Sequence, residues 1–414
     1  MDITITPGKL RGEIQVIPSK SQAHRYLICA ALSKGHTTLL CPETNRDIEA
    51  TVDCLNALGA HIQRTENGYG IDPITAVPKA ATLNCCESGS TLRFMLPIAG
   101  ALGVDATFRM AGRLPQRPLS PLWEEMERMG CTLTRPTPDT IRCQGKLQPG
   151  AYTMDGSVSS QYITGLLFAL SLLENSELTI TGNVESKPYI EMTQRAMELF
   201  SAPNYRSPGV VTVEGDWSNG AFWLAANALG SHATVINLDE NSPQGDRKAA
   251  VLLQNLKDFI NIDVSDIPDL VPILSVVASC NKGAKFQNIQ RLRLKESDRV
   301  ASTIAMLQAM GGKAEATDET ITVYGTGLRG GTVDACNDHR IAMSAAIAAT
   351  VCIEPVTILG AECVQKSYPR FWEEYNRLSC HCEPVRRLVW QSPITSNQPN
   401  IPGDSHASVI YSSE

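Results

Sequence analysis

Leu58-Gly59-Ala60-His61-Ile62 is one of three short stretches that decide the expected fold, and the others are Met129-Gly130-Cys131-Thr132-Leu133 and Met310-Gly311-Gly312-Lys313-Ala314. In each, an amphipathic helix ends at a Leu-Gly or Met-Gly step and runs into a short strand. The glycine stands where a helix C-cap needs a positive φ. The steps are unequally spaced, which indicates diverged repeats of a small α/β motif rather than an exact array. Chance matches of single turns are the alternative.

Length and composition bound the class of protein. The chain has 414 residues, more than one hydrophobic core usually supports, so we expect two domains or one large α/β body. The hydrophobic fraction of 43% and the charged fraction of 19% are typical of a packed enzyme. The net charge of -7 argues against a nucleic-acid binder with a broad basic face. An anionic ligand must therefore meet local clusters of Lys and Arg.

The first residues, MDITITPGKLRG, alternate like a strand and resemble neither a signal peptide nor a transit peptide. No apolar run approaches the roughly 20 residues that span a bilayer. We therefore expect a cytoplasmic protein that binds neither membrane nor nucleic acid. The 13 cysteines, an odd number, favour reduced thiols over a disulfide framework.

The C-terminal segment differs in composition from the rest. Residues 380–414 are rich in Ser, Pro and Asn and have no sustained period, which predicts a mobile tail. Cys380-His381-Cys382 contains zinc-binding residue types but has no second ligand pair at a suitable spacing. We expect no metal site.

The first helix start suited to anions lies at Pro18-Ser19-Lys20-Ser21-Gln22-Ala23-His24-Arg25, before an apolar helix. Lys20 and the hydroxyl of Ser21 stand beside free backbone N–H groups, and Arg25 lies about one turn further on. Together they form a cradle that fits phosphate. A capped helix with two solvated cations is the alternative.

Two further helix starts repeat this pattern. In the segment 87–93, Gly89 lets a ligand approach the backbone closely at the entry to a helix. Ser159, Ser160 and Gln161 place two hydroxyls and an amide donor before the helix that follows. Plain helix caps explain each alone, whereas three such starts favour anion binding.

Four other residues are candidates near the ends of predicted elements. Arg117 lies in a loop that Pro115 and Pro118 stiffen, where its guanidinium can grip carboxylate or phosphate in bidentate fashion. Arg340 and Lys366 each supply a cation near an element terminus. Asp269 precedes an apolar run, and its local sequence leaves helix capping and catalysis equally open. A surface Arg is the alternative at 117.

Lys295, Glu296 and Arg299 open a predicted amphipathic helix that runs toward Met310. Lys295 and Arg299 are four residues apart and share a face, and they would tune the pKa of Glu296 for acid/base work. Solvated charges at a helix start are the alternative.

Ten motifs occur in this order between residues 1 and 379: PSKSQAHR, ESGSTLR, GRLPQRP, SSQYITG, ESKPYI, VEGDWS, DIPDL, RLKESDR, NDHRIAM and QKSYPRFW. In this combination the chain resembles the 3-phosphoshikimate 1-carboxyvinyltransferases, also called EPSP synthases. The resemblance implies an α/β fold of two similar domains, each built from repeated βαβαββ units, with the substrate cleft between them. It implies one domain at 1–19 plus 214–379 and another at 20–213, with 380–414 outside.

The resemblance also implies the ligands of two substrates. For shikimate 3-phosphate it assigns Lys20, Ser21, Arg25, Ser159, Ser160, Gln161, Ser186, Asp269 and Lys295. For phosphoenolpyruvate it assigns Lys20, Gly89, Arg117, Gln161, Arg299, Arg340 and Lys366. Both substrates are anions, so bringing them together requires these cations in an otherwise acidic chain.

The implied reaction joins the 5-hydroxyl of shikimate 3-phosphate to C2 of phosphoenolpyruvate, as the penultimate step toward chorismate. C3 gains a proton and later loses one as phosphate leaves, so no cofactor is expected. The family pattern points to Asp269 as the base for the hydroxyl and to Glu296 as the acid for C3, with Lys20 as a further candidate. We expect a monomer.

Three places depart from the family pattern. Glu87-Ser88 stands where many relatives carry Asn-Ala, and Arg291 stands where some carry Asn. The stretch 200–209 is short for a full repeat, which predicts a missing or compressed strand. Sensitivity to inhibitors that mimic phosphoenolpyruvate is left open by Glu87.

Two rival functions remain at this stage. The UDP-N-acetylglucosamine enolpyruvyl transferases share the fold and the donor but typically carry a loop cysteine, and the loop 113–120 has none. A non-catalytic binding protein that kept the phosphate cradle is the other rival. The presence of both Asp269 and Glu296 weighs against it.

Overall fold

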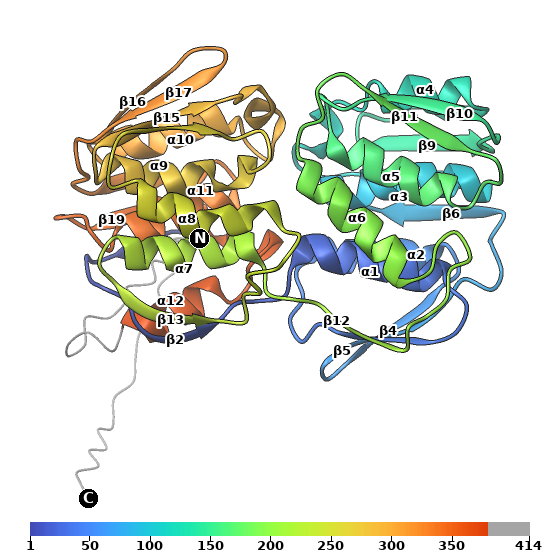
Figure 1. Ribbon diagram of the computed structural model, residues 1–414, viewed down its shortest axis with the longest axis horizontal. Helices are drawn as coiled ribbons and strands as arrows, with labels where there is room; N and C mark the ends of the chain where they lie inside the picture. The colour runs from blue at the N-terminus through green and yellow to red at the C-terminus, as the bar shows by residue number, and fades with distance from the viewer. Residues whose placement is uncertain (380–414) are drawn as a thin grey trace, which may run out of the picture.

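The computed structural model describes residues 1–379, which form two α/β bodies that lie side by side (Figure 1). The left-hand body contains the first two strands and everything from α7 onward, and the right-hand body contains the chain between them. The fold class expected from the sequence is confirmed.

The right-hand body contains ten strands and six α-helices. Its strands are β3 (Thr37–Leu40), β4 (His61–Thr65), β5 (Gly68–Asp72), β6 (Ala80–Asn84), β7 (Asp105–Arg109), β8 (Cys131–Thr134), β9 (Thr140–Gly145), β10 (Ala151–Asp155), β11 (Glu177–Thr181) and β12 (Val210–Thr212). Its helices are α1 (Lys20–Leu32), α2 (Arg46–Ala57), α3 (Gly89–Leu102), the short η1 (Leu114–Gln116), α4 (Leu122–Arg128), α5 (Ser160–Leu170) and α6 (Lys187–Leu199).

The left-hand body has the same ingredients. Its strands are β1 (Ile3–Ile5), β2 (Arg11–Gln15), β13 (His232–Ile236), β14 (Ile260–Asp263), β15 (Gly283–Gln287), β16 (Lys313–Ala316), β17 (Thr320–Tyr324), β18 (Gly331–Asp334) and β19 (Val356–Leu359). Its helices are α7 (Trp217–Ala228), η2 (Gly245–Lys248), α8 (Ala249–Asn255), η3 (Pro268–Leu270), α9 (Val271–Ser279), η4 (Gln290–Leu294), α10 (Arg299–Ala309), α11 (His339–Ala348), η5 (Ala361–Lys366) and α12 (Phe371–Ser379).

The repeated unit is visible in the order of strands within the sheets. The sheet β6-β7-β9-β8 and the sheet β14-β15-β17-β16 have one topology: a parallel pair joined through a helix, followed by an antiparallel hairpin. The sheet β12-β3-β5-β4 repeats it, with the last strand of the body supplying the first position. These are the expected βαβαββ units.

The Leu-Gly and Met-Gly steps act as predicted. Gly59, Gly130 and Gly311 have φ of +105°, +106° and +81°, which L side chains rarely adopt. They follow the ends of α2, α4 and α10, and the chain then enters β4, β8 and β16. In three different units, therefore, a glycine just after the helix ends the helix and lets the chain turn into a hairpin.

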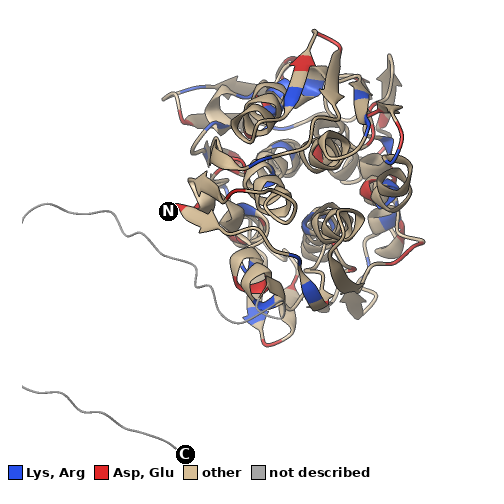
Figure 2. Cartoon of the chain, turned by 90° about the vertical axis from the view of Figure 1, so that its left-hand side faces the viewer, with Lys and Arg blue, Asp and Glu red and all other residues tan. Residues whose placement is uncertain are grey.

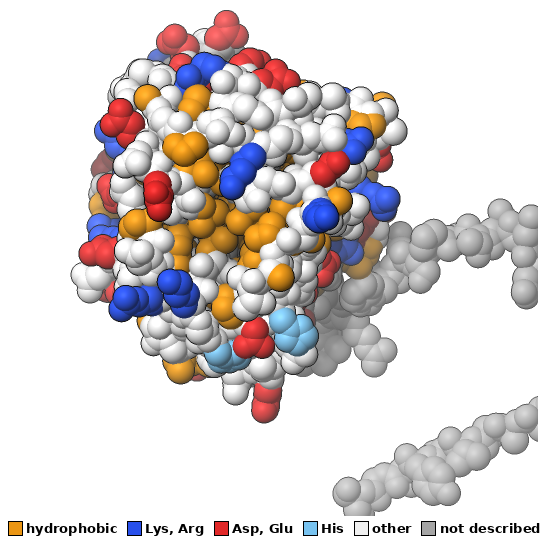
Figure 3. Space-filling model, turned by 90° about the vertical axis from the view of Figure 1, so that its right-hand side faces the viewer, with side chains coloured by type: hydrophobic (Ala, Val, Ile, Leu, Met, Phe, Trp, Pro, Cys, Tyr) orange, Lys and Arg blue, Asp and Glu red, His pale blue; other side chains and the backbone are white. Residues whose placement is uncertain are grey.

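The stretch 200–209 was expected to lose or compress a strand, and the structure has no strand there. The sheet β10-β11 has only two strands, and β12 pairs with β3 in another sheet instead. The ends of α5 and α6 are left uncovered, which opens a hollow lined by Leu167, Leu170, Leu172 and Leu173 among others. Figure 3 views the molecule from this side and shows apolar side chains gathered at its surface.

Helices fill the interior and sheets lie outside, as the end-on view of the left-hand body shows (Figure 2). Every residue of α9 and of α11 is buried; α9 is mostly apolar, and α11 is apolar apart from Ser344 once past His339 and Arg340.

Two hydrophobic clusters divide the core. One contains residues 3–17 and 221–378, and the other contains residues 23–213. The two connections between them lie side by side, where Ser19 N donates to Glu214 O at 2.7 Å. This division supports the expected domain boundaries, which stay a prediction. Within residues 1–379 no helix is both long and apolar enough to span a membrane.

Candidate active site

Helix N-termini from both bodies converge on one cleft between them. α1, α3 and α5 begin there from the right-hand body, and α7 and α11 begin there from the left-hand body. Each N-terminus presents N–H groups that have no partner within the helix itself, and the positive end of a helix dipole. The arrangement favours anions before any charged side chain is counted.

Lys20 and Arg25 are held inside the cleft by α1. Lys20 Nζ lies 2.8 Å from Asp47 Oδ2, and Arg25 Nε donates to Thr193 Oγ1 at 2.8 Å. Burial lowers the pKa of Arg25 to about 10. Burial also works against charge on Lys20, but Asp47 and Glu296 outweigh it and leave the pKa of Lys20 raised. The alternative of solvated cations is wrong here, because only 2% of Arg25 is exposed.

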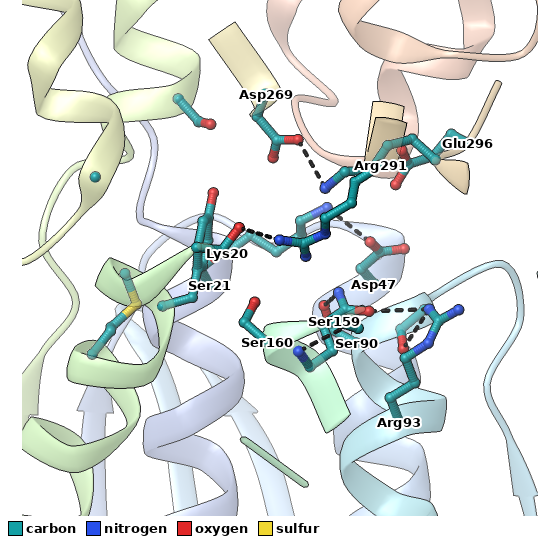
Figure 4. Close-up of a pocket in the computed structure, with 18 of the residues that line it drawn as sticks. Lys20, Ser21, Asp47, Ser90, Arg93, Ser159, Ser160, Asp269, Arg291 and Glu296 are labelled. Carbon is teal, nitrogen blue, oxygen red and sulfur yellow. Dashed lines mark hydrogen bonds and ion pairs between the residues drawn. The ribbon is translucent and has the colours of Figure 1, made fainter. Parts of the chain in front are cut away.

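The start of α5 lines the same wall of the cleft as the start of α1 (Figure 4). Ser159 caps the helix through the N–H of Gln161, and Ser160 follows as the first helical residue. Gln161 bridges two neighbours, because its Oε1 accepts from Arg93 Nη1 at 3.0 Å and its Nε2 donates to Ser90 Oγ at 2.9 Å. These two hydrogen bonds hold the Gln161 side chain between α3 and α5.

Ser186 reaches the cleft from the N-cap position of α6. Its backbone is left-handed, with φ of +56°. Its hydroxyl accepts from Arg291 Nη1 at 3.0 Å and donates to Ser265 O at 3.2 Å, so it contacts the opposite body twice. Ser21 lies near it on the cleft wall.

Gly89 begins α3 between two guanidinium groups. A Cβ built on Gly89 would lie 2.5 Å from Arg93 Nη1 and 2.6 Å from Arg117 Nη1. Only glycine fits without displacing one of them. Arg117 also donates through Nε to Leu294 O at 3.1 Å, which anchors the proline-stiffened loop to the opposite body.

Arg299 gathers three carboxylates behind the cleft wall. Its Nη1 lies 2.7 Å from Asp269 Oδ1, its Nη2 lies 2.6 Å from Glu296 Oε2, and its Nε lies 2.8 Å from Asp338 Oδ2. The Arg299 side chain is only 1% exposed. A buried guanidinium with three partners organises Asp269 and Glu296 as one unit.

The surrounding cations control the protonation of this unit. Burial alone would raise the pKa of Asp269, but Arg340 and Lys295 hold it well below its usual range. Arg299 and Arg117 likewise overcome burial and hold the pKa of Glu296 well below its usual range. Both side chains are therefore carboxylates in the free protein.

Lys295 behaves differently from the other cations. It lies 3.4 Å from Asp269 Oδ1, yet burial lowers its pKa to about 8. It is thus a cation that exchanges its proton close to neutral pH. The expectation that Lys295 and Arg299 share one helix face is wrong, because α10 begins only at Arg299 and Lys295 is extended.

Most of the residues expected for the site line one cleft. Arg299 and Lys366 are the exceptions among them, since neither lines the cavity itself. Arg299 acts from behind Asp269 and Glu296, and Lys366 Nζ pairs with Glu87 Oε2 at 2.8 Å.

No group of three or more His, Cys, Asp or Glu side chains within residues 1–379 is arranged to hold a metal ion. The cysteines of this region, among them Cys85 and Cys86, are free thiols. Cys380-His381-Cys382 and the expected mobile tail lie outside the described residues.

Comparison with known proteins identifies the family. The family model for EPSP synthase (3-phosphoshikimate 1-carboxyvinyltransferase) matches residues 5–375. The chain belongs to the EPSP synthase family. It is 38% identical to the 3-phosphoshikimate 1-carboxyvinyltransferase of Clostridium kluyveri, covering 91% of this chain and 97% of that protein. For the enzyme of the same name from Clostridium beijerinckii the identity is 36%, with the same coverage.

Solved structures agree in fold. An EPSP synthase from Acinetobacter baumannii superposes with a TM-score of 0.72 at 23% identity, covering 91% of this chain and 98% of that one. The family resemblance drawn from the ten motifs is therefore confirmed.

Two of the three departures, Glu87 and Arg291, lie at contacts between the two bodies. Glu87 pairs with Lys366, and Arg291 Nη1 lies 3.3 Å from Glu185 Oε2. Arg291 also lines the cleft and donates to Ser186 Oγ, so it places a cation at that wall (Figure 4).

Sequence reasoning missed several cleft residues. Arg93 stood within a quoted motif but was not assigned, although it is buried and lines the cleft; burial lowers its pKa to about 10. Its position four residues after Gly89, one helical turn on, was the available signal. Asp47 and Asp246 gave no local signal, because only the fold brings them to Lys20 and to Tyr189.

Proposed function

We propose that this chain transfers the enolpyruvyl group of phosphoenolpyruvate to the 5-hydroxyl of shikimate 3-phosphate, giving 5-enolpyruvylshikimate 3-phosphate and phosphate. The observation that carries the proposal is the convergence of helix N-termini and buried cations on a cleft that also holds two carboxylates. Family membership supports the same reaction.

In this proposal the acceptor lies along α1, α5 and α6. Lys20, Ser21 and Arg25 from α1, with Ser159 and Ser160 at the start of α5, receive its phosphate and ring. The remaining acceptor ligands are Gln161, Ser186, Asp269 and Lys295. Hydroxyls at helix starts suit a phosphate because they donate alongside the free N–H groups.

The donor lies beside Gly89, where the missing side chain lets the guanidinium groups of Arg93 and Arg117 pack close to the backbone at the start of α3. The remaining donor ligands are Lys20, Gln161, Arg299, Arg340 and Lys366. Bringing two phosphates and two carboxylates into one cleft requires this density of cations.

Asp269 and Glu296 carry the proton transfers. Asp269 takes the proton of the attacking 5-hydroxyl, for which its ionised state is the correct one. C3 of the donor gains a proton in the addition and loses one in the elimination. Glu296 donates the first of these protons and accepts the second. Because Glu296 is ionised in the free protein, it acquires its proton with the substrates, whose negative charges offset Arg299 and Arg117. Lys20 is the alternative donor.

A coupled assay for phosphate release tests the function. Phosphate should appear only when both substrates are present, and Lys20→Met should abolish its release. UDP-N-acetylglucosamine replaces the acceptor in a parallel reaction and should give no phosphate. Binding of shikimate 3-phosphate without turnover would instead support the non-catalytic rival.

Three further expectations, about domain boundaries, oligomeric state and location, belong to the same proposal. The domains divide at 1–19 plus 214–379 and at 20–213, the protein is a monomer, and the reaction takes place in the cytoplasm. Light scattering of the full chain at several concentrations tests the monomer.

A further inference from the structure

Glu87 and Lys366 form an ion pair that joins the two bodies at the donor end of the cleft. Glu87 Oε2 lies 2.8 Å from Lys366 Nζ and accepts from Asn337 Nδ2 at 3.2 Å. Lys366 also donates to Asn337 O at 2.9 Å, and its side chain is 9% exposed. Two of its three N–H donors are therefore engaged within the protein.

Backbone geometry makes room for this contact. Gly112 has a φ of +56°, and a Cβ there would lie 2.3 Å from Glu87 Oε2. Asn337 also has a positive φ, of +54°, at the turn before α11. The neighbouring Ser88 caps α3, because its Oγ accepts a hydrogen bond from Thr91 N at 3.3 Å. Glu87 is thus held by Gly112 and the start of α3 in its own body and by Asn337 and Lys366 in the other.

The pair lies next to the place assigned to the donor. Glu87 precedes Gly89 by two residues, and Gly89 faces the guanidinium groups of Arg93 and Arg117. An anion bound there meets the negative charge of Glu87. It also finds Lys366 already neutralised by that charge.

We propose that Glu87 is a specificity-determining residue of the donor subsite, which holds Lys366 in the free enzyme and yields it to the incoming phosphate. The inference rests on the proposed function. Donor binding is then an exchange of one anion for another on Lys366. Such an exchange favours a multiply charged phosphate over a singly charged analogue, because only the stronger anion displaces the carboxylate.

Kinetics of Glu87→Gln test the exchange. The variant should lower KM for phosphoenolpyruvate by about three- to tenfold, the range expected for removing a partly screened like charge. KM for shikimate 3-phosphate should change by less than about twofold in the same assay. Glu87→Asn, which also removes the charge, should act in the same direction. In a Lys366→Met background, Glu87→Gln should lose most of its effect on KM for phosphoenolpyruvate.

Glu43→Gln is the matched control. Glu43 also joins the two bodies, through Arg370 Nη1 at 3.3 Å, but Arg370 is not among the residues assigned to the donor. The control variant should leave both KM values unchanged. An unchanged or raised KM for phosphoenolpyruvate in Glu87→Gln, or an equal fall in Glu43→Gln, would overturn the proposal. If the parent protein released no phosphate from the two substrates, the proposed function itself would fail instead.

Discussion

Replacing Glu296 by Gln separates proton transfer from binding and from folding. Arg299 holds Glu296 as a carboxylate in the free protein, and Gln resembles its protonated form in size and hydrogen bonding. After the replacement, Arg299 keeps Asp269 at 2.7 Å and Asp338 at 2.8 Å. The buried guanidinium therefore stays compensated, and the loss in free energy of unfolding should be about 1.5–3 kcal/mol, the scale of one hydrogen bond to a charged group.

The expected loss in turnover is larger. A general acid or base contributes typically about 10²- to 10⁴-fold, which is about 3–5 kcal/mol of activation free energy. Phosphate release at saturating substrates should fall by that factor in Glu296→Gln, while calorimetry should give parent-like binding of shikimate 3-phosphate. Asp269→Asn should also slow turnover on this scale, with some loss of affinity because Asp269 contacts the hydroxyl in this proposal.

The control is Glu354→Gln, the same replacement at an exposed ion pair with Arg329. It should leave turnover and stability within error of the parent. Near-parent turnover in Glu296→Gln, together with abolished turnover in Lys20→Met, would refute the reasoning and move the donation to C3 to Lys20.

Three further predictions concern stability. Arg299→Met should lower the free energy of unfolding in urea by about 3–5 kcal/mol, because it strands three carboxylates, whereas the exposed Arg329→Met should not. Burial raises the pKa of Glu374 to about 7, so parent stability should fall as pH rises from about 4.5 to 7, and Glu374→Gln should lack that slope. Removing residues 380–414 should leave melting temperature and turnover nearly unchanged, since both hydrophobic clusters close by Leu378.

The features that could be predicted from the sequence are those that depend only on residues within one turn of each other along the chain. The glycines after α2, α4 and α10 and the serine cap of α5 are local choices of φ or of one side-chain acceptor. A reader of the sequence can therefore place helix ends and the hydroxyls that stand at them. The loss of a strand at 200–209 was predictable for a related reason, because a strand needs a minimum length of chain.

The features that were not predictable depend on which segments the fold brings together. Burial of Arg25 depends on α6, which supplies Thr193 far along the chain. The protonation of Glu296 likewise depends on Arg117 from the other body as well as on its neighbour Arg299. Local sequence supplied the groups and left their charge state open.

Ion pairs within the protein explain how an acidic chain can hold so many cations in one cleft. Lys20 pairs with Asp47, Arg340 with Asp269, and Lys366 with Glu87. These cations would repel one another if they were bare, and their burial would then be costly. Internal carboxylates offset that repulsion in the free protein, so an anionic substrate group that binds one of these three cations must outcompete a carboxylate already in place. Substrate affinity should consequently depend less on salt than the number of cations implies, because binding exchanges one protein-bound anion for another and releases few counterions from solution.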